Sequence, residues 1–499
     1  MPDGRRGPGS VDTLTPRRKA IVLASCCLSL LIVSMDATIV NVAIPSIQTD
    51  LGATASQLQW VIDIYTLVLA SLLMLSGAMG DRLGRRRVFQ TGLVIFALGS
   101  LLCSLAPGID ALIAARFLQA IGGSMLNPVA LSIISQVFTG PVERARAIGV
   151  WGGVVGISMA LGPTVGGLLI HLISWRAVFW INLPICLAAL VLTAIFVPET
   201  RSATMRTIDP IGQALAVAFL FGMVFALIEG PALGWGHPRV VVAAVVAVLT
   251  FVAFLRYEAR RRDPFIDLRF FRSVPFASAT VIAICAFASW GALLFMMSLY
   301  LQGARGFSAM QTGLIYLPIA VGALVFSPLS GRLVGRYGAR PSLLVSGVMI
   351  VTASIVLALL GESAPVWSLM VVFAVFGIGF SMVNAPITNT AVSGMPLDRA
   401  GAASAVTSTS RQIGVSIGVA LCGSVAGAAL ATAGPANSAV AGDFAASARP
   451  LWLVCAALGM VIVVLGVAST SARAMDSARR LAPLIDAPAG PGSRAATDV

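Results

Sequence analysis

Three charged side chains stand inside long apolar stretches of the sequence, and these residues are the best candidates for chemistry. Asp36, Asp63 and Arg116 each lie in a run of mostly apolar residues. A charge at the centre of a membrane-inserted helix costs about 2.5–3.5 kcal/mol, so each of them needs a compensating role. Carboxylates can take up protons or cations, and a nearby guanidinium changes how readily they do so. The three residues therefore predict a proton or cation site.

The three charges fall at similar depths if their runs are helices that cross a bilayer. At about 1.5 Å per residue, Asp36 lies roughly 24 Å from the start of its helix, and Asp63 and Arg116 lie about 9 and 10 Å from the outer ends of theirs. We expect the two acids to face a central cavity, with Arg116 setting their affinity for protons. The alternative is a static ion pair that joins two helices and leaves one acid over.

Two further charges lie inside later apolar runs. Arg411 is expected about 16 Å from the inner end of its helix. It is predicted to be either a cavity residue or a hydrogen-bond donor between helices. Glu229 lies near the outer end of its run and is expected to be an interfacial acid. The seven cysteines lack metal-ligand spacing, and the chain has only two histidines, so no metal site is expected.

The composition excludes several classes of protein. The chain has 499 residues, of which 58% are hydrophobic and 11% charged, and its mean hydropathy is +0.94, far too apolar for a soluble surface. The net charge of +13 is scattered among short loops rather than gathered on one face, so no nucleic-acid partner is expected. A phosphate-binding loop ending in Gly-Lys-Ser/Thr is absent, so we expect no enzyme, no cofactor and an ion gradient as the energy source.

The elements that position these charges are predicted to be transmembrane helices of about 20 apolar residues each. The first apolar run follows a basic tail as in a signal peptide, but it is too long and contains Asp36, so we expect it to be retained. Fourteen spans are predicted, at 20–45, 57–80, 88–106, 109–138, 146–171, 176–197, 209–229, 238–256, 274–301, 309–333, 341–361, 365–393, 400–430 and 449–470.

The distribution of Lys and Arg predicts the orientation. With the N-terminus inside, the cytoplasmic loops and tails hold 27 of the 33 basic residues and the outer loops hold four. This asymmetry places both termini in the cytoplasm of a multi-pass protein of the plasma (inner) membrane.

An internal repeat predicts the domain organisation. Gly77–Arg86 is echoed at Gly331–Arg340, and Gln57 is matched by Gln311 at the same offset. The predicted all-α fold thus has two parallel six-helix bundles plus an inserted helix pair, which suits alternating access. The predicted parts are a cytoplasmic N-tail at 1–19, a first bundle at 20–200, the inserted pair and its cytoplasmic connection at 201–273, a second bundle at 274–470 and a disordered tail at 471–499.

The turn Gly77–Arg87, which reads GAMGDRLGRRR, is a candidate conformational latch. Positive-inside topology alone would explain its arginines, but not an acid and glycines at fixed spacing. A helix-end Asp can receive Arg and backbone donors from a neighbouring span. We expect a cytoplasmic latch that forms in the outward-facing state, built from Gly77, Asp81, Arg82, Gly84, Arg85 and Arg86. In the second copy Gly335 replaces Asp81, so the acid belongs to the first bundle only.

The run at 146–171 is rich in glycine and contains a proline. Small residues at this spacing let a neighbouring helix approach closely, and Pro permits a kink. Ordinary close packing would explain such a run, but we expect a bendable contact that seals the inward leak path. The residues concerned are Gly156, Gly162, Pro163, Gly166 and Gly167.

Several of these motifs, in this order, resemble the fourteen-span drug:proton antiporter branch of the major facilitator superfamily. They are the turn Gly77–Arg87, the segment Met35–Pro45, Arg116 within ARFLQAIGG, Gly162–Gly167, Trp175–Pro184 and Ser410–Gly414. The resemblance covers about residues 20–470. The segment Trp60–Tyr65 is similar to that of pumps for quaternary ammonium compounds, which carry an acid at the position of Asp63.

The resemblance implies a proton-coupled exporter of lipophilic, cationic drugs, with protons, a small lipophilic substrate and the bilayer as its partners and no obligatory protein partner. Alternatives are a dedicated exporter of one natural product, a proton-driven nutrient importer, and a membrane sensor or scaffold. The glycine–proline motif argues against import, and the short loops offer no domain for a sensor's partner.

Overall fold

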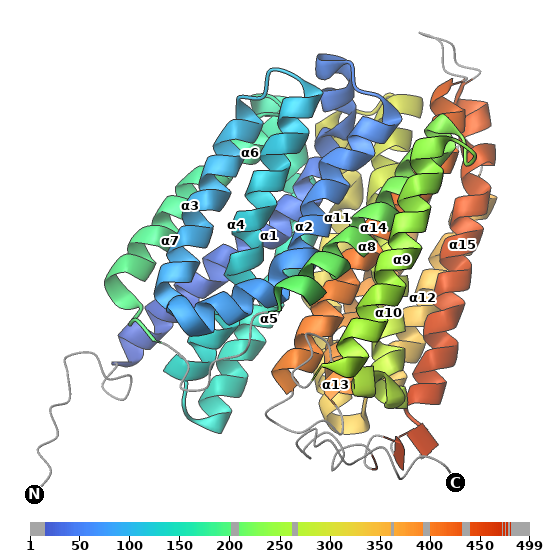
Figure 1. Ribbon diagram of the computed structural model, residues 1–499. Helices are drawn as coiled ribbons and strands as arrows, with labels where there is room; N and C mark the ends of the chain where they lie inside the picture. The colour runs from blue at the N-terminus through green and yellow to red at the C-terminus, as the bar shows by residue number, and fades with distance from the viewer. Residues whose placement is uncertain are drawn as a thin grey trace, which may run out of the picture.

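The computed structural model describes residues 15–200, 209–261, 268–360, 364–392, 400–431 and 440–471, with five further residues up to Arg480. Within these ranges every regular element is a helix, and the long helices lie side by side (Figure 1). The predicted N-tail at 1–19 lies mostly outside the described residues, as does most of the predicted tail at 471–499.

The first half of the chain forms one bundle. Its elements are α1 (Pro16–Leu51), α2 (Ala55–Leu83), α3 (Arg85–Ser104), α4 (Ile109–Val137), α5 (Pro141–Leu172), the short α6 (Ala177–Trp180) and α7 (Asn182–Phe196). The span predicted at 176–197 is thus divided near Ile181 into α6 and α7. Two helices follow that belong to neither repeat, α8 (Pro210–Leu233) and α9 (Pro238–Arg260).

The second half begins with a 3-10 turn, η2 (Leu268–Arg272). Its helices are α10 (Val274–Leu299) with a π-helical end η3 (Tyr300–Ala304), α11 (Ala309–Tyr337), α12 (Arg340–Leu359), α13 (Val366–Val392), α14 (Ala400–Ala431) and α15 (Val440–Ser469). The same pairs of helices pack in both halves: α1 with α5 as α10 with α14, α2 with α4 as α11 with α13, and α3 with α4 as α12 with α13.

The repeat extends to the way in which its helices begin. Thr54 caps α2 by accepting from the backbone N–H of Gln57, whose side chain in turn accepts from the backbone N–H of Thr54. Ser308 and Gln311 form the same capping box at the start of α11. Each box satisfies backbone donors that a helix start leaves unpaired. The equivalence of Gln57 and Gln311 therefore has a structural cause.

Two pairs of helices make the most extensive contacts between the halves. Along the contact of α2 with α14, Gln59 Nε2 donates to the carbonyl oxygen of Val419 at 2.6 Å. Along the contact of α5 with α11, the hydroxyl of Thr164 donates to the carbonyl oxygen of Gly313 at 3.0 Å. A Cβ at Gly313 would meet the Pro163 oxygen at 2.8 Å, so this crossing requires a glycine.

The inserted pair is attached mainly through α8, which packs against α2, α14 and α9. Near its outer end, Glu229 accepts from Ser56 Oγ at 2.5 Å and from Trp60 Nε1 at 2.9 Å. Near its inner end, Gln213 donates to the backbone oxygen of Ser71. Glu229, expected to be an interfacial acid, thus ties α8 to α2.

Twelve helical segments of the described residues are long and apolar enough to cross a membrane. They comprise α1 to α4, α6 with α7, α8 to α13 and the described part of α15. The helices α5 and α14 are of comparable length, but both contain residues whose side chains lie outside the described part. The structure is therefore an all-α membrane fold with at least these twelve candidate spans.

Candidate transport site

Asp36 and Arg116 meet inside the first bundle. Arg116 Nη1 lies 2.5 Å from Asp36 Oδ2, and both side chains are excluded from solvent. Arg116 Nε also donates to the backbone oxygen of Val61 at 3.1 Å. Its guanidinium lies over the ring of Tyr65, 4.1 Å from the centroid, which favours the cation further.

The remaining oxygen of Asp36 is bonded as well. Asp36 Oδ1 accepts from Gln119 Nε2 at 2.9 Å and from Asn182 Nδ2 at 3.0 Å. Both amides also donate to the hydroxyl of Ser100. A buried pair whose lone pairs and protons are satisfied in this way is the arrangement that makes burial of two charges tolerable. This geometry is that of the alternative prediction, a static ion pair that joins α1 to α4.

The structure does not bring Asp63 into this network. Asp63 is completely buried on α2 where that helix meets α14. Beside its carboxylate stand the hydroxyls of Thr66 and Ser416, which are hydrogen-bonded to each other at 2.6 Å. Neither carboxylate oxygen has a hydrogen bond of normal geometry to the described residues. Asp63 is thus the acid that takes no part in the ion pair of Asp36 with Arg116, and it lies at a contact between the two halves.

Arg411 lies on α14 and faces α13 and α10. Arg411 Nη2 donates to Thr388 Oγ1 at 2.9 Å and approaches the Asn384 oxygen at 3.4 Å. Its guanidinium lies 5.8 Å from the centroid of Phe287. Of the two predicted roles, the described contacts correspond to a hydrogen-bond donor between helices.

An aromatic cluster that sequence reasoning missed lies next to Arg411. Trp290 stacks on Phe380 at 4.3 Å and on Phe376 at 6.3 Å, and Phe287 meets Phe380 edge-on at 5.0 Å. The residues come from α10 and α13. Their spacing of three residues on α10 and four on α13 was visible in the sequence, but lipid-facing aromatics have the same spacing. Such faces can bind lipophilic rings and cations.

The candidate latch binds to its own bundle. Asp81 at the end of α2 pairs at 2.7 Å with Arg85 at the start of α3. Arg86 Nη2 donates to the Ala194 oxygen at 2.5 Å, and its backbone N–H donates to Glu199. Gly84 has a φ of +110°, and a Cβ there would lie 2.5 Å from Glu199 Oε1. The turn therefore fits around the segment after α7, and Glu199 is a partner that sequence reasoning missed.

The other latch residues lie at the inner end of α2. Gly77 and Gly80 face Pro128 and Val129 of α4. Arg82 occupies the last turn of α2. The described contacts of Gly77, Gly80, Asp81, Gly84, Arg85 and Arg86 are with residues of the first bundle.

The predicted glycine motif gives α5 two close contacts. A Cβ at Gly162 would meet the Thr38 side chain, and one at Gly166 would lie 2.8 Å from the Ile39 side chain, both on α1. A Cβ at Gly167 would meet the backbone oxygen of Ala309 on α11. Pro163 approaches the same helix through its carbonyl oxygen. The surroundings of Gly156 lie outside the described residues.

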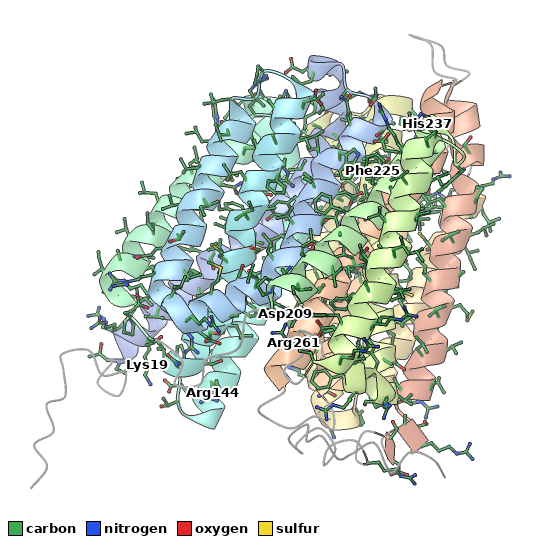
Figure 2. The ribbon with its side chains drawn as sticks, in the orientation of Figure 1. Lys19, Arg144, Asp209, Phe225, His237 and Arg261 are labelled. Carbon is green, nitrogen blue, oxygen red and sulfur yellow. The ribbon has the colours of Figure 1, made fainter. Side chains whose placement is uncertain are left out.

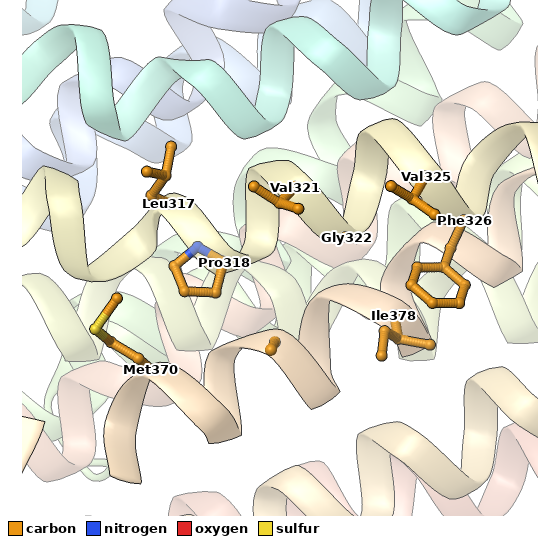
Figure 3. A pocket seen from close by; sticks show the side chains of 9 residues that line it. Leu317, Pro318, Val321, Gly322, Val325, Phe326, Met370 and Ile378 are labelled. Atoms are coloured by element: carbon orange, nitrogen blue, oxygen red, sulfur yellow. The ribbon is translucent and has the colours of Figure 1, made fainter. Parts of the chain in front are cut away.

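An open apolar groove of about 290 Å³ lies between α11 and α13 (Figure 3). Its lining includes Leu317, Val321, Val325, Phe326 and Met370, and every lining side chain is apolar. Such a groove has no group that could bind a proton or select a charged ligand, so it does not compete with Asp63 as the candidate site.

Comparison with known proteins places the chain in a family. A family model described as Major Facilitator Superfamily matches residues 26–419. The multidrug resistance protein Stp of Mycobacterium tuberculosis is 36% identical over 82% of this chain and 76% of that protein. The tetracenomycin C resistance and export protein of Streptomyces glaucescens is 35% identical over 80% and 74%. The multidrug efflux pump LfrA of Mycolicibacterium smegmatis is 32% identical over 83% and 82%.

A solved structure shows the same fold. A bacterial homologue of the human lysosomal transporter Spinster, in an inward-facing and unoccupied conformation, aligns with a TM-score of 0.62 at 18% identity, over 93% of this chain and 98% of that one. Together with the family match and the sequence relatives, this likeness confirms the resemblance drawn from the motifs. The chain belongs to the Major Facilitator Superfamily and is a multi-pass membrane transporter rather than an enzyme.

Proposed function

We propose that this protein exports lipophilic, cationic drugs across the plasma membrane in exchange for protons, by alternating access. The observation that carries the proposal is Asp63, an acid buried at the contact of α2 with α14 without a cationic partner among the described residues. Relatives named for multidrug resistance and efflux support the drug-export part. The proton gradient supplies the energy, so no cofactor is needed.

Asp63 suits proton–drug exchange because it lies between α2 and α14, which belong to the two halves and must move against each other during alternating access. An ionised carboxylate without a partner is expensive to bury, whereas a protonated one is neutral. A rearrangement of α2 against α14 changes the surroundings of Asp63 and with them the cost of its charge. Loss of the proton would leave a negative charge that a cationic substrate can neutralise. The aromatic faces of Phe287, Trp290, Phe376 and Phe380 offer contact area for the substrate's lipophilic rings.

The contacts between the halves suit an inward-facing state. Gln302 on η3 donates to the Val42 oxygen near the outer end of α1, and Thr164 meets Gly313 near the outer end of α5. Along α2, the hydrogen bonds to α14 run from Gln59 near the outer end to Ala70 at the middle. In the same arrangement, Asp81 at the inner end of α2 pairs within its own bundle.

Several finer points belong to the proposal. Counting α5 and α14 with the twelve candidate spans makes fourteen, and the basic loops then place both termini in the cytoplasm. In the outward-facing state, Asp81 exchanges Arg85 for donors of the second bundle and closes the inner side. Gly162, Pro163, Gly166 and Gly167 keep α5 close to α1 and α11 and seal the outer side in the inward-facing state.

A dedicated exporter of one natural product is the second candidate. The names of three relatives favour it, since they refer to tetracenomycin C, methylenomycin A and puromycin. A panel of chemically different substrates separates the two functions, because a multidrug pump moves several of them and a dedicated pump moves one.

The test is efflux by the purified protein in liposomes with an imposed pH gradient. We expect a fluorescent cationic dye to move against its own gradient, and a protonophore to abolish that movement. Dye transport that is unaffected by the protonophore would contradict proton coupling. A lack of transport for every cationic compound, together with transport of one neutral or acidic natural product, would favour the dedicated exporter.

A further inference from the structure

A basic cavity lies at the inner end of α9, away from the proposed transport site. Its volume is about 360 Å³, within the range typical of ligand pockets, roughly 300–1,000 Å³. It is lined by Ala253, Arg256, Tyr257, Arg260 and Arg261. Three of its five lining residues thus carry a permanent positive charge, and none carries a negative one.

One of the three arginines is held in place by α8. Arg261 Nη1 lies 2.5 Å from Asp209 Oδ1 and donates to the Tyr257 hydroxyl at 2.6 Å (Figure 2). The Tyr257 hydroxyl donates to the same Asp209 oxygen. Desolvation lowers the pKa of Arg261, but Asp209, Tyr257 and Glu258 together outweigh it and hold that pKa above its usual value. This triad forms a fixed wall of the cavity.

The other two arginines are available to a ligand. Arg256 and Arg260 are both exposed, and they are four residues apart, so they lie on one face of α9. Neither forms an ion pair or a hydrogen bond with the described residues. Two adjacent guanidinium groups provide paired N–H donors of the geometry that phosphate oxygens accept.

The same face of α9 continues as an apolar stripe along the membrane-spanning part. Val242, Val245 and Leu249 are 60%, 50% and 63% exposed, and they recur at spacings of three and four residues that lead to Arg256 and Arg260. Only 17% of the most apolar window of α9 is buried, the lowest share among the candidate spans. The stripe therefore presents hydrocarbon-facing surface directly above the arginine pair.

We propose that this cavity binds the phosphate headgroup of an anionic phospholipid of the cytoplasmic leaflet, with an acyl chain along the stripe of Val242, Val245 and Leu249. The charge of the arginine pair complements the phosphate, and the stripe complements the acyl chain. Basic pockets on the cytoplasmic side of membrane proteins bind such headgroups. The lipid anchors the outer helix of the inserted pair, while Glu229 and Gln213 attach its inner helix to α2.

The test compares lipids that differ in headgroup charge. The purified full-length protein is titrated in detergent with phosphatidylglycerol or phosphatidylethanolamine, and binding is followed by native mass spectrometry. The double variant Arg256→Gln/Arg260→Gln removes the pair. The control variant Arg332→Gln/Arg336→Gln removes two exposed arginines with the same spacing at the inner end of α11. Inorganic phosphate and glycerol phosphate are added as competitors.

We expect phosphatidylglycerol to bind the wild-type protein and the control variant more tightly than phosphatidylethanolamine does. Each arginine near an anionic surface contributes about 1 kcal/mol, so the double variant should bind about thirtyfold more weakly. If the double variant does not purify as a single species, Arg256→Gln and Arg260→Gln are measured separately. Each should bind phosphatidylglycerol about fivefold more weakly than the wild-type protein. The variant Arg256→Lys/Arg260→Lys should retain most of the binding.

Two results would overturn the proposal. Equal phosphatidylglycerol binding by the wild-type protein and the Arg256→Gln/Arg260→Gln variant would show that this cavity is not the site. Displacement of the lipid by inorganic phosphate or glycerol phosphate at equal concentrations would show that the cavity takes a soluble phosphate, because the acyl chain would then contribute nothing. Neither result depends on drug export, so they are independent of the transport assay.

Discussion

Asp36 and Arg116 form an ion pair of 2.5 Å in the interior of the first bundle, and both side chains are excluded from solvent. The amides of Gln119 and Asn182 complete the bonding of the carboxylate. This relationship divides the buried charges of the protein into two kinds. The pair joins α1 to α4, whereas Asp63 has no ionic partner among the described residues.

The first prediction concerns stability. Asp36→Asn should lower the free energy of unfolding by about 3–5 kcal/mol, because it leaves the Arg116 guanidinium buried without its counter-charge. Asp36→Leu combined with Arg116→Met should be less destabilising than either single change. Thermal unfolding in detergent measures the effect.

The control for this prediction is Asp50→Asn. Asp50 pairs with Arg176 at 2.7 Å, but both side chains are partly exposed, so its loss should cost under about 1 kcal/mol. Equal unfolding temperatures for the Asp36 and Asp50 variants would contradict the structural role of the buried pair.

The second prediction concerns coupling. Asp63→Asn should reduce efflux driven by a pH gradient at least tenfold, because the amide cannot exchange a proton. It should leave the unfolding temperature unchanged, because no ion pair with the described residues is lost. Liposome efflux and thermal unfolding are measured on the same preparation, with Asp50→Asn as the control. Full gradient-driven efflux by Asp63→Asn would remove this acid from the mechanism.

The third prediction concerns the conformational equilibrium. Gly313→Ala places a methyl group 2.8 Å from the Pro163 oxygen and should push α11 away from α5. Overpacking of this kind costs about 1–3 kcal/mol, so the population should shift toward the outward-facing state by roughly five- to 150-fold. Distances between spin labels at the outer ends of the two helices report the shift.

Gly335→Ala is the matched control for the third prediction. It lies on the same helix, and a Cβ there meets nothing within 4 Å. Unchanged distance distributions for both variants would show that the close approach of α5 and α11 does not set the equilibrium.

The fourth prediction concerns the turn after α2. Asp81→Asn weakens an ion pair that crosses this turn from α2 to α3, between two largely buried side chains, so it should lower the free energy of unfolding by about 1–3 kcal/mol. If Asp81 also closes the inner side of the outward-facing state, transport should fall at least tenfold in the same variant. Glu143→Gln breaks the Lys19–Glu143 pair at 2.9 Å on the same side and serves as the control. Normal transport by Asp81→Asn at normal expression would exclude the latch.

The sequence by itself determined the membrane class, the helical fold, the repeat and the family. These properties depend on local features, namely the length of apolar runs, the charges of the loops and the spacing of motifs. The capping boxes at Thr54 and Ser308 illustrate the point, because four consecutive residues are enough to specify the start of a helix.

Only the tertiary structure decided which charges are partners. Periodicity places Asp36, Asp63 and Arg116 on helices at similar depths, but the rotation of each helix against its neighbours depends on packing along its whole length. That rotation turns Asp36 toward Arg116, turns Asp63 toward Ser416 and brings Glu199 to Gly84. Contacts between residues far apart in the chain leave no local signal. For this reason the sequence left open whether both acids face a cavity or one of them is held in an ion pair.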